Sequence, residues 1–270
     1  MHSLNLFPSL IFALALAILG LTACPSPSSN DAGGLPDANV ALADAGLGDL
    51  SSEPAVDAGE PVESPGDVNG FGTITGDCGL IDGALLSQTT PTLIENAIDF
   101  ADDPYDESDY EDLTEGGQEI LDDGNAGGSS ILSEVFAYEV LHRCEGATLL
   151  KTEMEVVYND PAGKLTDLLV DFDGTKVGVS VTRAVGYPRD DPYTEDAAKN
   201  ILEQKLQGVL DSTANVSAED AWSKQILHII AYADQHADSL AAAYATVDAA
   251  LKSNTLVLVT VSHGDDEFLY

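Results

Sequence analysis

The segment KVGVSVTRA, residues 176 to 184, alternates valine with small or polar side chains, and this alternation predicts a β-strand with two different faces. Ser180 and Thr182 occupy the face opposite the valines. The Asp-Gly pair at 173 and 174 predicts a two-residue hairpin, whose register places Asp167 opposite Ser180. Carboxylate oxygens suit a hard cation such as Mg²⁺, whereas a Ser hydroxyl is a poor ligand and Thr carries no charge. This face therefore combines one acid with two hydroxyls, a weak set for metal chemistry.

A second acid, Glu139, falls inside the apolar stripe of the helix expected at 127–144, three residues after Phe136 and four after Val135. It lies either at the edge of a site or at the margin of the core. His228, in an isoleucine-rich run, is interpreted as a core histidine rather than a ligand. The acidic stretch 263–267 is interpreted as a polar turn after the last strand.

A series of helices and strands must position these residues. The expected elements are helices at 90–103 and 127–144, strands at 147–158, 165–172 and 175–184, a helix at 193–210, a helix at 238–253 and a strand at 255–262. The segment 224–232 fits a buried strand or a helix, and its isoleucine-rich run favours a strand. Thr194 is the expected cap of the helix at 193–210. From residue 127 onward the order is αβββαβαβ, which predicts an α/β domain with a mixed sheet flanked by helices.

Charge limits the partners of the chain. It has 47 acidic and 10 basic residues, a formal net charge of -37, and no Lys or Arg before Arg143. Residues 99–123 hold twelve acidic residues and no basic one. A phosphate backbone would be repelled by such a chain, so nucleic-acid binding is not expected.

The N-terminal apolar run at residues 9–21 is short for a membrane span, and the tetrapeptide Leu21-Thr22-Ala23-Cys24 lies at its end. This sequence resembles the lipobox of bacterial lipoproteins. The resemblance implies cleavage before Cys24, acylation there with a fatty acid such as palmitate, and attachment to the bacterial cell envelope outside the cytoplasm, with the outer membrane favoured. Because the preceding residues contain no Lys or Arg, a soluble export signal or an uncleaved anchor remain alternatives.

Four segments follow from composition. Residues 1–23 are the expected signal peptide, and 24–70, which contain no Lys, Arg or aromatic residue, are the expected disordered tether. Residues 71–128 are an acidic N-terminal extension, and 129–270 are the α/β domain. Once Cys24 is acylated, Cys78 and Cys144 remain, and in an oxidising compartment this pair predicts a disulfide, with two buried thiols as the alternative.

The order of elements in residues 129–262 is similar to the restriction-endonuclease-like core of the PD-(D/E)xK superfamily. The resemblance implies a site in which Glu139 matches the helix glutamate and Asp167 matches the aspartate of the motif. Ser180 and Thr182 then stand where the family has an acid and a lysine. The family uses these acids to hold Mg²⁺, so the substitutions indicate a degenerate site, and no cofactor is expected unless the site is active.

Three hypotheses follow. The first is a lipid-anchored, non-catalytic binding or envelope-interaction module, with the membrane as the partner of the anchor. The second is a metal-dependent phosphodiesterase or nuclease that uses Glu139, Asp167 and Mg²⁺. The third is a purely structural surface lipoprotein.

Overall fold

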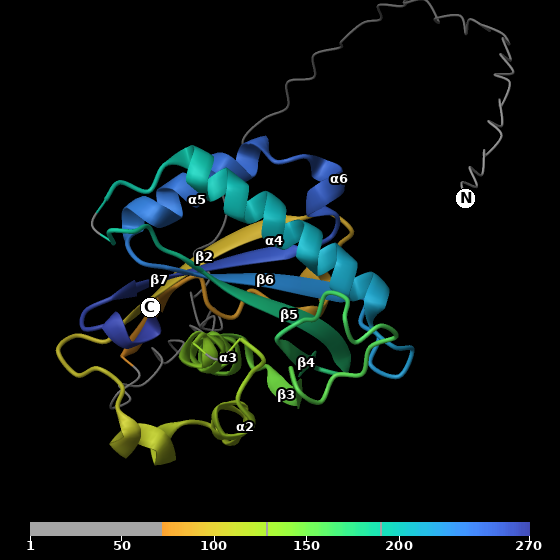
Figure 1. Cartoon of the computed structure of the whole chain (residues 1–270), viewed down its shortest axis with the longest axis horizontal. Helices are drawn as coiled ribbons and strands as arrows, with labels where there is room; N and C mark the ends of the chain where they lie inside the picture. Colours follow the sequence, from red (N-terminus) through yellow and green to blue (C-terminus); the bar gives the residue numbers. More distant parts are fainter. Residues whose placement is uncertain (1–71, 128, 190) are drawn as a thin grey trace, which may run out of the picture. The chain divides into compact units, whose positions relative to one another are not determined.

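The computed structural model describes residues 72–127, 129–189 and 191–270. Within these ranges seven strands form one sheet in the order β1-β2-β7-β6-β5-β4-β3 (Figure 1). Their bounds are β1 Thr73–Gly76, β2 Thr92–Asp99, β3 Thr148–Thr152, β4 Leu168–Phe172, β5 Thr175–Ala184, β6 Lys224–Ala231 and β7 Leu256–His263. The central strands β2, β7, β6 and β5 are parallel, and β1, β4 and β3 are antiparallel to their neighbours. The predicted α/β class with a mixed sheet is confirmed.

Helices cover both faces of the sheet (Figure 1). On one side lie α4 Glu195–Asn215, α5 Asp234–Thr246 and α6 Ala249–Lys252, and on the other lie α2 Glu115–Asp123 and α3 Ile131–Glu145. The short helix α1 Gly83–Ser87 and the 3₁₀ turns η1 Glu107–Asp112 and η2 Glu267–Leu269 complete the chain. No helix in these ranges is long and apolar enough to cross a membrane.

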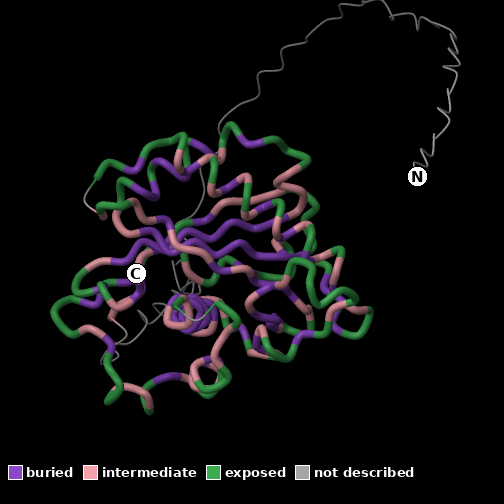
Figure 2. The backbone as a smooth tube through the Cα atoms, viewed as in Figure 1, coloured by how far each residue is buried: buried purple, intermediate pink, exposed green. Residues whose placement is uncertain are grey.

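The two faces of the sheet belong to two separate apolar clusters, and the buried residues follow the strands (Figure 2). Val177, Val179 and Val181 of β5 pack with α3, whereas Ala184 packs with α4. Every residue of β6 is buried, which explains its continuous apolar run and confirms the strand predicted at 224–232. Because side chains alternate along β5, Ser180 and Thr182 face the α4 layer.

The helix predicted at 90–103 is wrong, because Thr92–Asp99 forms β2, which pairs in parallel with β7. Its buried residues are Ile94, Asn96 and Ile98, an alternation with the period of a strand. The apolar residues in this short segment fit both a helical and a strand period, and parallel pairing with β7 decided between them. As a result, residues 72–127 contribute two strands to the sheet.

Two further boundaries differ from the sequence prediction. The strand predicted at 147–158 ends at Thr152, after which Glu153 and Glu155 lie in a turn. The helix predicted at 238–253 is divided into α5 and α6, because Asp248 accepts a hydrogen bond from the N–H of Ala250 and starts a new helix. Thr194 caps α4 as predicted, accepting from the N–H of Ala197.

A disulfide joins Cys78 to Cys144, with 5.0 Å between the two Cα atoms, as predicted. The neighbouring Glu145 carboxylate accepts hydrogen bonds from the backbone N–H groups of Gly79 and Ile81. The disulfide and these bonds fix the segment after β1 to the C-terminal end of α3. Cys24 and the expected signal peptide and tether lie outside the described residues.

Candidate functional site

The hairpin of β4 and β5 positions Asp167. The Asp-Gly turn has positive φ at both residues, and it sets the predicted register, with Phe172 opposite Thr175 and Leu168 opposite Val179. Strand pairing ends at Leu168, the residue that follows Asp167 in the sequence. The Asp167 N–H donates to the carbonyl of Val179 at 3.0 Å, and its Oδ2 accepts the N–H of Val181 at 2.6 Å. Beyond the end of β4, the Asp167 carboxylate thus accepts an N–H group of β5 in place of a backbone carbonyl.

The two hydroxyl residues of β5 have different surroundings. Ser180 is half-buried, and its Oγ lies 3.2 Å from Oγ1 of Thr166, the residue before Asp167. Thr182 is also half-buried and lines a pocket together with Lys205 of α4. Ser180 is therefore engaged with a second hydroxyl, and Thr182 lies beside a cation from another element.

Asp167 lies among charged groups from three parts of the chain. Burial raises its pKa to about 7, and the negative charge of Glu153 raises it further. The hydrogen bond from Val181 and the positive charge of Lys205 act in the opposite direction. Burial therefore favours the protonated form of this carboxyl group to a higher pH than in an exposed aspartate.

Glu134 in the first turn of α3 is a site residue that the sequence analysis missed. It is 4% exposed, and it accepts hydrogen bonds from the Ser130 hydroxyl at 3.0 Å and the Asn125 amide at 2.5 Å. Burial raises its pKa to about 7, and the charge of Asp167 contributes to the rise. An acid in the first turn of a helix is ordinary by sequence, so nothing distinguished Glu134 from an acid that interacts with the helix dipole.

Glu139 has structural partners instead. Its Oε1 accepts hydrogen bonds from the backbone N–H of Thr114 at 2.9 Å and from the Thr114 hydroxyl at 2.7 Å, and its Oε2 lies 2.7 Å from Nε of Arg143. Thr114 is the N-cap of α2. Glu139 therefore links the start of α2 to α3, and none of these contacts reaches Asp167.

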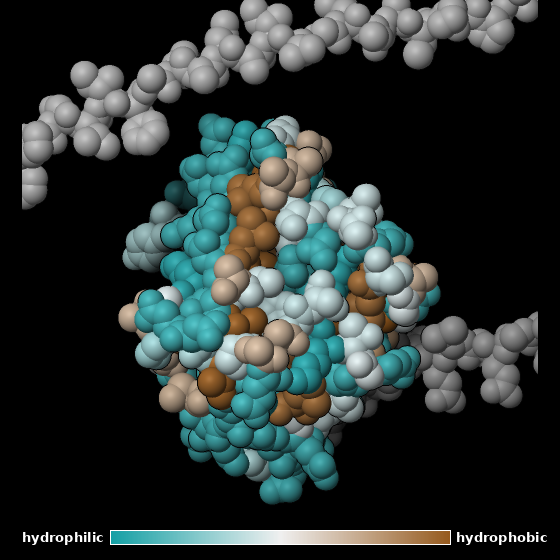
Figure 3. All heavy atoms as spheres, turned by 90° about the vertical axis from the view of Figure 1, so that its right-hand side faces the viewer, coloured by the Kyte–Doolittle hydropathy of each residue, from teal (hydrophilic) through white to brown (hydrophobic). Residues whose placement is uncertain are grey.

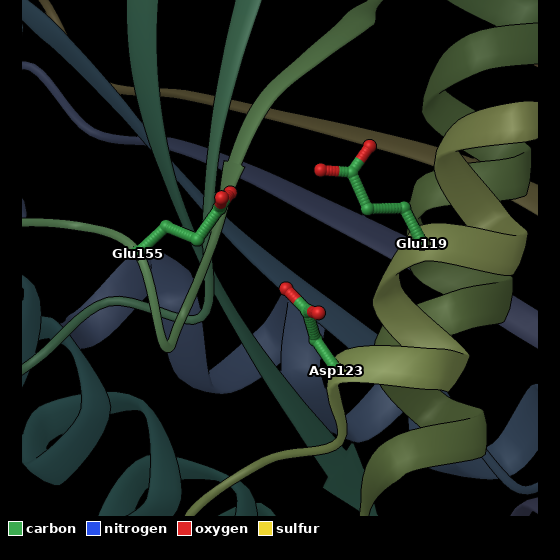
Figure 4. Close-up of side chains that lie close together, drawn as sticks. All are labelled: Glu119, Asp123 and Glu155. Carbon is green, nitrogen blue, oxygen red and sulfur yellow. The ribbon is translucent and has the colours of Figure 1, made fainter.

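Within the described ranges, one group of three acidic side chains is close enough to share a cation: Glu119, Asp123 and Glu155 (Figure 4). Their ligand atoms lie within 4.8 Å of one another, and all three residues are exposed. The Thr152 hydroxyl donates to Asp123 at 2.8 Å, and the Thr152 N–H donates to Glu155 at 3.2 Å. These bonds account for the orientation of two of the three acids, so the group is consistent with a solvated surface cluster.

The remaining candidates lie in structural positions. His228 is fully buried, with Nε2 2.7 Å from the Thr260 hydroxyl, which donates in turn to Asn96. Near the C-terminus, Asp266 accepts a hydrogen bond from Ser262 at 2.5 Å. Nε2 of His263 lies 3.3 Å from Asp234. These residues stabilise the core and the end of β7.

No family model matches the chain, and no solved structure matches it. The chain is similar to a Dictyostelium discoideum protein named AAC-rich mRNA clone AAC4 protein, with 43% identity over 164 residues. The match covers 58% of this chain and 24% of that protein, so the similarity spans about a quarter of the relative's length.

Proposed function

We propose that the domain is a non-catalytic binding module, held outside the cytoplasm by a lipid on Cys24, and that its site is a degenerate form of a restriction-endonuclease-like site. Cleavage chemistry of that kind depends on carboxylates free to hold a metal and on a cation that activates water. The residues that occupy the corresponding positions here are engaged in other interactions.

The observation that carries this proposal is the 2.6 Å hydrogen bond from the Val181 N–H to Asp167 Oδ2. It fixes one carboxylate oxygen of Asp167 against the backbone of β5. The hydroxyl of Ser180, a poor ligand in itself, lies against Thr166. Glu134, the acid that interacts with Asp167, accepts two hydrogen bonds of its own. These interactions support a site that does not hold a divalent metal.

Charge supports a partner other than nucleic acid. The net charge of -37 opposes the approach of any long polyanion. The face of the domain in Figure 3 is mostly hydrophilic, with hydrophobic side chains gathered in narrow strips. A small ligand recognised in a local pocket agrees with this surface better than a nucleic acid does.

Titration of the full chain with Mn²⁺ tests the proposal, and Glu119→Gln serves as a background that weakens the exposed acidic cluster. We expect no Mn²⁺ site that depends on Asp167. The double variant Ser180→Glu, Thr182→Lys should remain folded and gain such a site. A Mn²⁺ site in the parent that is lost in Asp167→Asn would overturn the degenerate-site proposal. If the double variant unfolds, the resemblance of this site to a nuclease site loses its support.

A second candidate function is a metal-dependent phosphodiesterase, in which Glu134 takes the role expected of Glu139. The observation that favours it is the electrostatic interaction of Asp167 with Glu134, Glu153 and Lys205. These residues supply acids and a cation, although not at the positions of the family motif. Nucleic-acid cleavage that requires both a divalent metal and Asp167 would favour the phosphodiesterase over the binding module.

A further inference from the structure

A pocket of about 590 Å³ opens at the carboxyl end of β5. It is lined by the end of this strand, the following loop at 185–189, one side of α4 and Tyr270. In open sheets with parallel strands, ligands bind in the crevice at the carboxyl ends of the strands. The pocket thus lies at the carboxyl end of one of the parallel strands, and Thr182 of the candidate site is part of its wall.

Positive charge is concentrated in this pocket. Arg183, Arg189 and Lys205 all line it, and they are three of the ten basic residues of a chain with a net charge of -37. In the part of the chain that the structure describes, no Asp or Glu side chain forms an ion pair within 4 Å with any of the three. The pocket is thus lined by positively charged side chains, although the protein as a whole is strongly negative.

Backbone contacts hold the two arginines in place. Arg183 Nη1 donates to the carbonyl of Leu269 at 3.0 Å, and Arg189 Nη2 donates to the main-chain oxygen of Tyr270 at 3.1 Å. A guanidinium has five N–H donors, so each arginine keeps donors for a ligand after making its backbone bond. Such a fork matches the oxygen atoms of a phosphate or carboxylate group.

The neighbouring acids only partly offset these cations. Asp167 interacts with Lys205, and Asp266 interacts with Arg189. Burial raises the pKa of both acids. The three cations outnumber these two acids, so the pocket favours an anionic ligand.

We propose that the pocket binds a small phosphate monoester, with Arg183, Arg189 and Lys205 holding the phosphate and the Tyr187 ring contacting the organic part. This inference names the ligand class of the binding module proposed above and so rests on that proposal. Tyr187 lines the pocket and is 98% exposed, and a large aromatic side chain in that state offers a free surface to a ligand. The volume suits a ligand of small-molecule size, and the charge of the chain excludes a long polyanion.

Calorimetric titration of the full chain with phenyl phosphate and with inorganic phosphate tests the inference. The wild type should bind both, and phenyl phosphate more tightly. Lys205→Gln and Arg183→Gln should each weaken both ligands by about tenfold or more, the loss expected for a charged hydrogen bond. Tyr187→Ala should remove the preference for phenyl phosphate and leave the phosphate affinity unchanged.

The matched control is Lys199→Gln, which removes a positive charge from the same helix at a residue paired with Glu203 outside the pocket. It should leave binding unchanged. Absence of binding by the wild type, or equal losses in Lys199→Gln and Lys205→Gln, would overturn the inference. If Lys205→Gln lowers the melting temperature, Arg189→Gln supplies the comparison. If the wild type binds neither phosphate ligand and shows no metal-dependent cleavage of nucleic acid, only the proposed ligand class is refuted. Metal-dependent cleavage would instead refute the proposal that the domain is non-catalytic.

Discussion

The Val181 N–H donates to Asp167 Oδ2 at 2.6 Å, so the acid of the candidate site is also the group that completes hydrogen bonding at the edge of β5. The same side chain follows the paired part of β4 and β5 and interacts electrostatically with Glu134 and Lys205. A change at Asp167 should therefore affect stability and the electrostatics of the site together.

The first prediction concerns pH. Burial raises the pKa of Asp167 to about 7 from an ordinary value of 3.8. The folded state thus retains a proton that the unfolded chain releases near pH 4. The contribution of this group to the free energy of unfolding is full below pH 4 and is lost as pH rises to about 7. We expect Asp167→Asn to gain stability relative to the wild type between pH 5 and pH 8, by on the order of a few kcal/mol. Urea unfolding at several pH values measures this difference.

Asp173→Asn is the control for this prediction, because it removes an exposed acid from the same hairpin. Its stability relative to the wild type should change less with pH. Equal pH dependence in the two variants would show that Asp167 does not hold a proton in the folded state.

The second prediction concerns Glu139. Its carboxylate links Thr114 to Arg143 and does not contact the candidate site. Glu139→Gln should lower the free energy of unfolding by about 1–3 kcal/mol, because it weakens a buried charged hydrogen-bond network. Phenyl phosphate affinity should stay within twofold of the wild type. Loss of binding at unchanged stability would instead place Glu139 in the site.

The third prediction concerns the disulfide between Cys78 and Cys144, which are 66 residues apart. Replacing both with Ala should lower the free energy of unfolding by at most about 4 kcal/mol, the loop-closure value for this separation. Denaturant titration of the oxidised wild type and the double variant measures the loss. A reducing agent should destabilise the wild type and leave the variant unchanged, and equal sensitivity of the two proteins would argue against the bond.

The fourth prediction concerns the anchor. Cys24→Ala should abolish acylation and move the protein from the detergent phase to the aqueous phase in a phase-separation experiment. The Cys78→Ala, Cys144→Ala protein is the control and should stay with detergent. A Cys24→Ala protein that still partitions as the wild type does would identify the apolar run as an uncleaved anchor.

Local sequence signals predicted the elements that depend on local physics. The Asp-Gly turn gave the register of β4 and β5, and the buried run at 224–232 gave a central strand. The segment of β2 was misread because its pairing partner β7 lies more than 150 residues away, and pairing over that distance has no local pattern.

The site was predicted less completely than the fold. Asp167 and Ser180 were placed on adjacent strands because a tight turn connects them. Glu134 and Lys205 come from two helices on different faces of the sheet, and their interactions with Asp167 depend on how those helices pack. The basic pocket likewise combines residues from a strand, a loop and a helix.

The most direct test of the central claim is turnover. The full chain is incubated with single-stranded DNA, duplex DNA and RNA in Mg²⁺ or Mn²⁺, with EDTA and Asp167→Ala as controls. A degenerate binding site predicts no cleavage above the EDTA control with either metal. Cleavage by the wild type that disappears both in EDTA and in Asp167→Ala would contradict the claim and establish a metal-dependent phosphodiesterase.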